Sequence, residues 1–253
     1  MKTMLRSSAC LVLVIAVGCA TEHAPSEQAP PEQQPVAESA VIVDHIIVGI
    51  SDLDEGIEQL EALTGVRAVI GGEHPGRGTR NALISLGSGH YMELLAPVPG
   101  GVIDEFDDLA SDLDGFAELT PIGWAASSTN VDDLAENLVG EGYEVAGPVA
   151  GSRLKPDGSV LEWRTLAIEE PLLAGAPFFI EWGEASDHPS ESSPAGCELG
   201  AVNLQDPDSD ELGALMRLLG LDVGVEQGVS LALEFVLECP NGVVRISSER
   251  IEQ

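Results

Sequence analysis

Three polar side chains interrupt apolar strand-like runs, and their types fit a metal-ligand set. His45 lies within the β-branched run of residues 41–50, Glu93 within Tyr-Met-Glu-Leu-Leu, and Glu181 within Phe-Phe-Ile-Glu-Trp. Burying an ionised carboxylate among apolar residues is unfavourable unless a cation or donor meets it. One histidine and two glutamates, completed by water, suit Zn²⁺, Mn²⁺, Fe²⁺ or Ni²⁺. We therefore expect His45, Glu93 and Glu181 as ligands, with Glu93 or Glu181 also available as a base.

The element that positions His45 is a strand followed by a helix within residues 41–65. The first ten residues are rich in valine and isoleucine, which favours a largely buried strand. Ser51 or Asp52 can cap a helix, and Gly65 suits its left-handed end. One apolar helical stripe is formed by Leu53, Ile57, Leu60 and Leu63.

The same order of strand, helix and β-rich region recurs twice further along the chain, beginning near residues 124 and 201. Recurrence of this kind predicts repeated supersecondary modules. We predict an α+β fold of βαβββ modules, the first two forming a curled mixed sheet around a cleft and the third alongside. The expected divisions are an export signal at 1–18, a disordered tether at 19–40, modules at 41–97, 121–185 and 199–250, and linkers at 98–120 and 186–198.

Positively charged residues gather in the first two modules of a chain that is otherwise very acidic. The chain has 11 Lys and Arg against 43 Asp and Glu, a net charge of −32, which excludes nucleic-acid binding. Retained cations favour an anion site for a carboxylate or phosphate, although each could equally pair with an acidic neighbour at the surface. The residues concerned are Arg67, Arg77, Arg80, Arg153, Lys155 and Arg164.

The glycine-rich segment at residues 71–81 predicts a loop whose backbone can approach a ligand closely. It carries four of the predicted ligand-binding residues. The complete predicted set is His74, Arg77, Arg80, Asn81, Arg153 and Trp163, the tryptophan serving as a pocket wall or as core packing. Elsewhere a short helix is expected at residues 103–109, and the sequence contains no nucleophile-elbow, phosphate-loop or dinucleotide motif.

The first residues of the chain predict an export signal. Lys2 and Arg6 precede an apolar run at residues 11–17, which is too short to span a bilayer. The small residues directly before Cys19 resemble the lipobox of a bacterial lipoprotein, and the resemblance implies that Cys19 is lipidated; an ordinary cleaved signal is the alternative. Ala20 then favours the outer membrane, with the folded part in the periplasm or outside the cell.

Cys197 and Cys239 remain once the export signal is set aside. In an oxidising compartment they can form a disulfide that clamps the third module. Two free buried thiols are the alternative, and the sequence leaves both open.

The pattern His45-x6-Asp52 opening a βαβββ module that Glu93 closes resembles the vicinal oxygen chelate (glyoxalase/bleomycin-resistance/dioxygenase) superfamily. The segments HPGRGTRNAL, GSRLKPDG and PFFIEWG resemble its glyoxalase-like branch. The resemblance implies a metal held by the first and last strands of two modules. His45, Glu93 and Glu181 match that scheme. The second histidine is replaced by Gly123 or Trp124, which leaves His74 or His188 as candidates for the missing nitrogen.

Two functions follow as expectations. The first is an exported, lipid-anchored, metal-dependent lyase or isomerase acting on a small oxygenated substrate, as the resemblance implies. The alternative is a metal-free envelope protein that binds or sequesters a small apolar or anionic ligand. A catalytically silent scaffold is a third reading.

Overall fold

The computed structural model describes residues 41–74, 76–100, 109–169 and 173–248. The expected export signal, tether and Cys19 lie outside the described residues, as does most of the short helix expected at 103–109. None of the helices in the described ranges combines the length and apolar character needed to cross a membrane.

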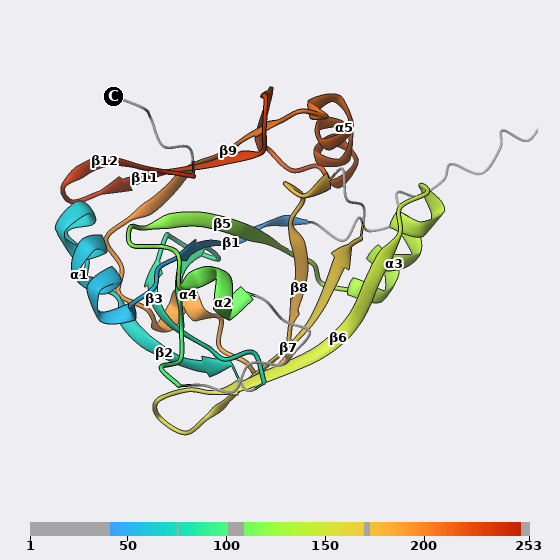
Figure 1. Ribbon diagram of the computed structural model, residues 1–253. Helices are drawn as coiled ribbons and strands as arrows, with labels where there is room; N and C mark the ends of the chain where they lie inside the picture. The colour runs from blue at the N-terminus through green and yellow to red at the C-terminus, as the bar shows by residue number, and fades with distance from the viewer. Residues whose placement is uncertain (1–40, 75, 101–108, 170–172, 249–253) are drawn as a thin grey trace, which may run out of the picture. The chain divides into compact units, whose positions relative to one another are not determined.

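The predicted α+β class is confirmed, because each module has the order strand, helix and three strands (Figure 1). The first contains β1 (Ile42–Gly49), α1 (Leu53–Thr64), β2 (Val69–His74), β3 (Thr79–Ser85) and β4 (Tyr91–Pro97). The second contains β5 (Thr120–Ser127), α3 (Val131–Gly140), β6 (Val145–Leu154), β7 (Val160–Ile168) and β8 (Phe178–Trp182). The third contains β9 (Glu198–Asp206), α5 (Ser209–Leu219), β10 (Gly224–Gln227), β11 (Ala232–Cys239) and β12 (Gly242–Ser247). Two short helices, α2 (Leu109–Leu113) and α4 (Pro189–Ser192), lie in the predicted linkers.

Local signals in the first helix act as the sequence predicts. The Asp52 side chain accepts hydrogen bonds from the backbone N–H groups of Asp54 and Glu55, and Gly65 ends α1 at φ 79°. The glycine-rich segment differs from the prediction, because β2 continues through Gly71 and Gly72 to His74 and pairs with β3. Backbone ladder bonds to β3 therefore organise most of the segment predicted as a loop.

The first two modules share one eight-stranded sheet with the order β2-β3-β4-β1-β5-β8-β7-β6. Within each module the first strand pairs in parallel with the last, and β1 joins β5 antiparallel at the centre. The sheet is so strongly curled that its edge strands β2 and β6 come into contact (Figure 1). Side chains alternate across it, so one set of alternate residues faces the inside of the curl.

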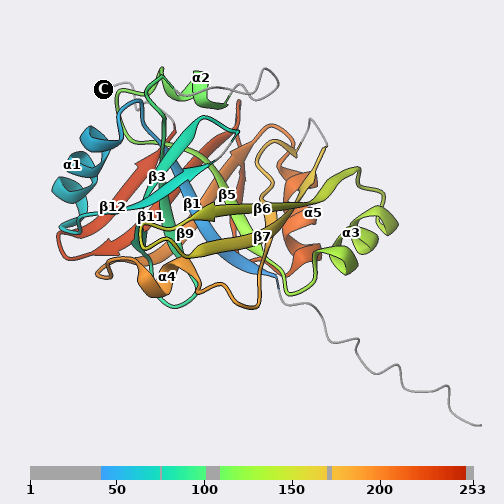
Figure 2. The same ribbon diagram turned by 90° about the horizontal axis from the view of Figure 1, so that it is seen from below.

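The third module repeats the order of elements but not the order of strands. Its sheet runs β10-β9-β11-β12, with β9 parallel to β10 and antiparallel to β11. The helix α5 carries the chain from β9 straight to the adjacent strand, as in an ordinary βαβ crossover. The expectation of a third module like the first two therefore holds for the element order only. Strands β11 and β12 pack across β5, behind the large sheet in Figure 2.

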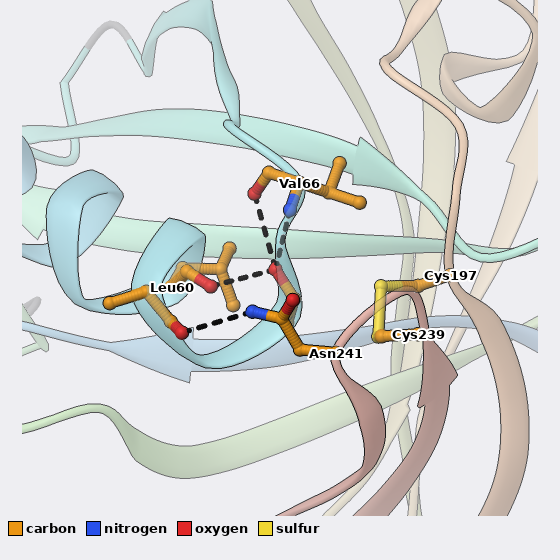
Figure 3. Close-up of a disulfide and its surroundings, with 7 residues drawn as sticks. Leu60, Val66, Cys197, Cys239 and Asn241 are labelled. Carbon is orange, nitrogen blue, oxygen red and sulfur yellow. Dashed lines mark hydrogen bonds between the residues drawn. A yellow bond between two sulfur atoms is a disulfide. The ribbon is translucent and has the colours of Figure 1, made fainter.

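A disulfide holds the third module together, and the hairpin turn beside it fastens that module to the first. Cys197 and Cys239 are bonded, which joins the start of β9 to the end of β11. Beside this bond the Asn241 side chain donates to the Ala62 carbonyl of α1 at 3.2 Å (Figure 3). The backbone N–H of Asn241 donates to the Thr64 carbonyl at 3.3 Å. The turn thus satisfies two carbonyls at the end of a helix, where intrahelical partners are lacking.

Removing the disulfide should destabilise the protein without changing its fold. The bond joins residues 42 apart, and chain-entropy arithmetic for such a loop gives about 4 kcal/mol. We expect the Cys197→Ser/Cys239→Ser double variant to lose about 2–4 kcal/mol of unfolding free energy in urea titrations. Excess dithiothreitol should lower the unfolding free energy of the wild type to that of the variant. A difference in unfolding free energy that stays unchanged under reducing conditions would show that it does not come from the disulfide.

Candidate active site

A cavity of about 890 Å³ lies against the inner face of the curled sheet. Its size is that of a small-molecule site. All eight strands of the sheet contribute to its lining, and along β1, β4 and β8 the lining residues alternate, because side chains alternate between the two faces of a sheet. The polar lining includes His45, His74, Thr79, Asn81, Tyr91, Glu93, Arg77 and Arg153. The apolar lining includes Ile47, Leu95, Ile122, Trp124, Leu173, Ala176, Pro177, Phe178 and Ile180.

A bulge in β1 brings Asp44 to the side of His45. Neighbouring strand residues normally face opposite ways, but the pairing of β1 with β5 shifts between Val43 and His45 and leaves Asp44 as the extra residue. The Asp44 Oδ1 atom lies 2.7 Å from His45 Nδ1, and only 1% of Asp44 is exposed. The bulge therefore builds a buried aspartate–histidine pair in the cavity wall.

Asp44 is held by three N–H groups from different segments. His45 contacts one carboxylate oxygen, while Trp182 Nε1 donates to Oδ2 at 3.0 Å and His188 Nε2 lies 3.2 Å from the same atom. His188 Nδ1 accepts the backbone N–H of Ser190, so its hydrogen sits on Nε2 and points at Asp44. The carboxylate is thus fully engaged although no cationic Lys or Arg of the described chain pairs with it.

This environment keeps Asp44 ionised. Burial alone would raise the pKa of Asp44, but the hydrogen bonds from His188 and His45, with their charges, hold it well below its usual range. Asp44 is therefore ionised and can only accept, so His45 Nδ1 must donate. In neutral His45 the lone pair lies on Nε2, the atom that faces Glu93.

Glu93 provides the second carboxylate of the site. Its Oε1 accepts from Asn81 Nδ2 at 2.7 Å and lies 3.5 Å from His74 Nε2, while its Oε2 lies 3.8 Å from His45 Nε2. Burial raises the pKa of Glu93, but His74, His45, Asn81 and Arg153 together lower it below its ordinary value. An ionised glutamate therefore stands opposite Nε2 of His45.

The neighbouring rings are kept neutral. Tyr91 stacks on His45 with centroids 4.5 Å apart and an interplanar angle of 24°. Burial, followed by the charges of Asp44 and Glu93, raises the pKa of Tyr91 well above its ordinary value. Burial also lowers the pKa of His74 despite the opposing charge of Glu93. At neutral pH both groups are uncharged walls of the site rather than counter-ions.

Of the predicted ligand-binding residues, five line the cavity and one does not. His74, Arg77, Asn81, Arg153 and Trp163 all face it. Arg80 is the exception, because it follows Thr79 on β3 and so points to the opposite face, where it borders a shallow hollow beside Lys155.

Glu181 does not join His45 and Glu93, contrary to the prediction. Its neighbours Ile180 and Trp182 face the cavity, whereas Glu181 Oε2 accepts the backbone N–H of Val131 at the start of α3 at 2.8 Å. Arg164, 3.8 Å from Oε1, pairs bidentately with Asp132 on the same helix. Glu181 therefore anchors α3 on the outer face, and its predicted roles as ligand and base do not fit this position.

Strand register explains why the two glutamates differ. In the first module β1 pairs His45 with Tyr91, which puts Glu93 two residues further along β4. In the second module β5 pairs Ala125 with Phe178, so the position matching Glu93 is Ile180. Glu181 is one residue beyond it, and one residue reverses the face. Ala125 takes the place of His45, instead of the Gly123 or Trp124 predicted.

The donor set does not fit the divalent metal that the superfamily commonly uses. The first module supplies two ligating side chains, His45 and Glu93. The matching residues of the second module, Ala125 and Ile180, have no ligating side-chain atoms. Of the two histidines considered for the missing nitrogen, His188 is committed to Asp44, and His74, also in the first module, has Nδ1 against Thr79 and Nε2 3.5 Å from Glu93 Oε1. Within the described ranges no group of three or more His, Cys, Asp or Glu residues is arranged to hold a metal ion. We therefore derive no step through a metal.

Several residues of the site were not singled out from the sequence. Asp44 carried a signal, since an acidic residue directly before a histidine in an apolar strand needs a buried partner. Tyr91 and the indole N–H of Trp182 gave no such signal, because aromatic residues in strands are usually core. Their roles depend on contacts between β1, β4 and β8 that only the folded sheet creates.

The comparisons with known proteins agree with this fold. A family model described as "Glyoxalase-like domain" matches residues 43–219. The chain belongs to this glyoxalase-like domain family, within the vicinal oxygen chelate superfamily. No curated protein matches the chain.

Among solved structures, the chain is similar to a hypothetical protein from Staphylococcus aureus, with 19% identity, a TM-score of 0.58, and coverage of 82% of this chain and 85% of the other. It also matches methylmalonyl-CoA epimerase from Mycobacterium tuberculosis, with 22% identity, a TM-score of 0.39, and coverage of 55% and 85%. It matches a variant of the Streptomyces coelicolor methylmalonyl-CoA epimerase in complex with 2-nitronate-propionyl-CoA as well. The identity is 20%, the TM-score is 0.41, and the match covers 57% of this chain and 96% of the other. The first likeness extends to the fold alone, and the other two assign no reaction.

Replacing Asp44 by asparagine should destabilise the protein. The amide turns one acceptor into a donor that faces the N–H groups of His45, Trp182 and His188. Leaving buried donors unsatisfied costs about 1–3 kcal/mol each, so we expect a loss of about 2–4 kcal/mol of unfolding free energy at pH 7. Urea titration of the wild type and the variant measures this loss of unfolding free energy. Asp187→Asn is the control, since Asp187 is exposed and pairs with Lys155 only at 3.6 Å.

The effect of Asp44→Asn should also depend on pH. The pKa of Asp44 is lowered on folding, so its stabilisation is complete above the unfolded value of about 4 and is lost as pH falls toward the folded value. We expect the difference in unfolding free energy between the wild type and Asp44→Asn to become smaller from pH 7 to pH 3. A gap that stays constant or widens on acidification would contradict an ionised, hydrogen-bonded Asp44.

Proposed function

We propose that this protein is an isomerase or lyase that moves a proton on a small oxygenated substrate, with His45 as the general base. The observation that carries the proposal is the Asp44–His45 pair, whose free Nε2 faces a small-molecule cavity 3.8 Å from Glu93. A buried carboxylate that orients a histidine and stabilises its protonated form is a general device of proton-transfer enzymes.

The proposed step needs no metal. A substrate C–H bond next to a carbonyl breaks, its proton forms an N–H bond at His45 Nε2, and its electron pair moves onto the carbonyl oxygen as an enolate. The imidazolium then lies between the carboxylates of Asp44 and Glu93, which stabilise it electrostatically. Return of the proton to another position gives an isomerase, and loss of a group from the enolate gives a lyase.

A second candidate function is binding without chemistry. It is favoured by the apolar part of the cavity, where Phe178, Ile180 and Leu173 offer a wall for a hydrocarbon group. A sequestering protein would keep this wall and would need no oriented base.

Proton exchange in D₂O separates the two candidates. The probes are 2-oxo-4-phenylbutanoate and 4-phenylbutan-2-one, which share a ketone and an aryl group, and ¹H NMR follows loss of their C3 proton signals. We expect the protein to accelerate exchange of one or both probes, and His45→Gln to slow it by at least about 100-fold, the usual contribution of a general base.

His90→Gln is the matched control, because His90 contacts the Val43 carbonyl and does not line the cavity. It should exchange the probes at the wild-type rate. Binding of a probe without accelerated exchange would favour the sequestering protein, and equal exchange by wild type and His45→Gln would remove His45 as the base.

We further propose that the protein is exported and lipidated at Cys19. The Cys197–Cys239 disulfide supports this proposal, since disulfides persist in oxidising compartments. Cells fed labelled palmitate should incorporate the label into the wild type and not into Cys19→Ser, and the label should fractionate with the outer membrane. Equal labelling of Cys19→Ser, or none of the wild type, would contradict lipidation at this residue.

A further inference from the structure

The cavity wall contains a buried guanidinium. Arg153 is 5% exposed, lies on β6 and faces the cavity. One of its nitrogens donates to the Gly71 carbonyl on β2. In the part of the chain that the structure describes, no carboxylate lies within 4.0 Å of it, so it has no ion-pair partner there.

Four other cations of the described chain differ from Arg153 in this respect, because each sits beside an acidic side chain. The pairs are Arg67 with Glu61, Lys155 with Asp187, Arg164 with Asp132, and Arg245 with Glu234. A buried charge left without a counter-ion is unfavourable, and burial accordingly lowers the pKa of Arg153. Arginine nonetheless stays protonated at neutral pH, so the cavity keeps a positive charge.

Gly72 leaves the space for the guanidinium, which binds the carbonyl of the preceding residue, Gly71. A Cβ on Gly72 would stand 3.2 Å from a terminal Arg153 nitrogen and 2.7 Å from the Leu154 carbonyl. Gly72 also has φ 148°, which favours glycine. The edges of the curled sheet therefore meet closely, and a single guanidinium nitrogen is used to bridge them. The remaining donors of the fork are left for the cavity.

Glu93 is an acidic group that acts on Arg153 from a distance, and it is already engaged. Its charge raises the pKa of Arg153 against the effect of burial, but its carboxylate is bound by Asn81 and lies beside His74 and His45. Glu93 therefore offsets part of the positive charge without occupying the fork.

We propose that Arg153 binds the carboxylate of the substrate, so that the ligands of this site are organic carboxylates with an apolar remainder. The guanidinium fork matches a carboxylate in shape and charge. His45 and Arg153 line the same cavity. A substrate whose carboxylate is bound by Arg153 therefore has the C–H bonds next to its carbonyl group near His45, while its apolar part contacts Phe178 and Ile180. This inference rests on the function proposed above and names its substrate class.

Ligand-induced thermal stabilisation tests the proposal. The probes are 2-oxo-4-phenylbutanoate, 2-oxohexanoate and pyruvate, each beside the methyl ketone that lacks the carboxylate, at one ionic strength. We expect 2-oxo-4-phenylbutanoate to raise Tm by at least about 3 °C at saturation and its neutral counterpart to give less than about a third of this. Arg153→Met should abolish the carboxylate-dependent part, and Arg153→Lys should keep some of it.

Each shift is measured against the variant's own Tm, so loss of the Gly71 contact alone does not imitate loss of binding. Arg164→Met is the control for removal of a cation and should respond like the wild type. Equal stabilisation by the neutral ketones, no stabilisation by any carboxylate, or a wild-type response in Arg153→Met would overturn the proposal. A response lost in Arg77→Met but kept in Arg153→Met would also overturn it, by assigning the carboxylate to Arg77.

The two proposals fail in different ways. In His45→Gln the carboxylate should still raise Tm although exchange is lost. Carboxylate binding without exchange in the wild type would support Arg153 and contradict the proton-transfer function. Exchange of the neutral ketone with no preference for the carboxylate would support His45 and contradict Arg153.

Discussion

The site depends on one buried carboxylate that pairs with no cationic Lys or Arg of the described chain. Asp44 is stable as an anion because His45, Trp182 and His188 each direct an N–H group at it. These donors come from β1, from the end of β8 and from the N-cap of α4, so the first module, the second module and the linker that follows them meet at one side chain. The same interaction sets the tautomer of His45 and hence what the cavity can do.

The curl of the large sheet decides which side chains reach this cavity. Alternate residues of β1, β4 and β8 point inward, so His45, Glu93 and Ile180 face the ligand space while Glu181 faces α3. Contact between β2 and β6 closes the curl, and Arg153 bonded to Gly71 is part of that closure. The group that shapes the cavity therefore also supplies its buried positive charge.

The matching strands of the two modules contribute different kinds of residue to the cavity. The first contributes His45, His74, Asn81 and Glu93, whereas the matching strands of the second contribute Ala125 and Ile180. A metal held equally by both modules needs ligands from each, and this chain has kept them on one side only. The second module supplies the apolar residues Phe178 and Ile180 together with the cation Arg153 on β6, which suits a substrate with a hydrocarbon part and an anionic end.

The sequence by itself determined the modules, their helices and their order. Those features depend on short-range patterns: Asp52 and Gly65 bound α1 through their own backbone preferences, and apolar spacing marks each helix. His45 and Glu93 were also identifiable because each interrupts an apolar strand, and Arg153 because cations are few in so acidic a chain. The tertiary structure alone decided which of them meet. The bulge at Asp44, the register that turns Glu181 outward and the altered strand order around β9 arise from pairing between distant segments. A shift of one residue in that pairing reverses a side chain's face without changing any local pattern.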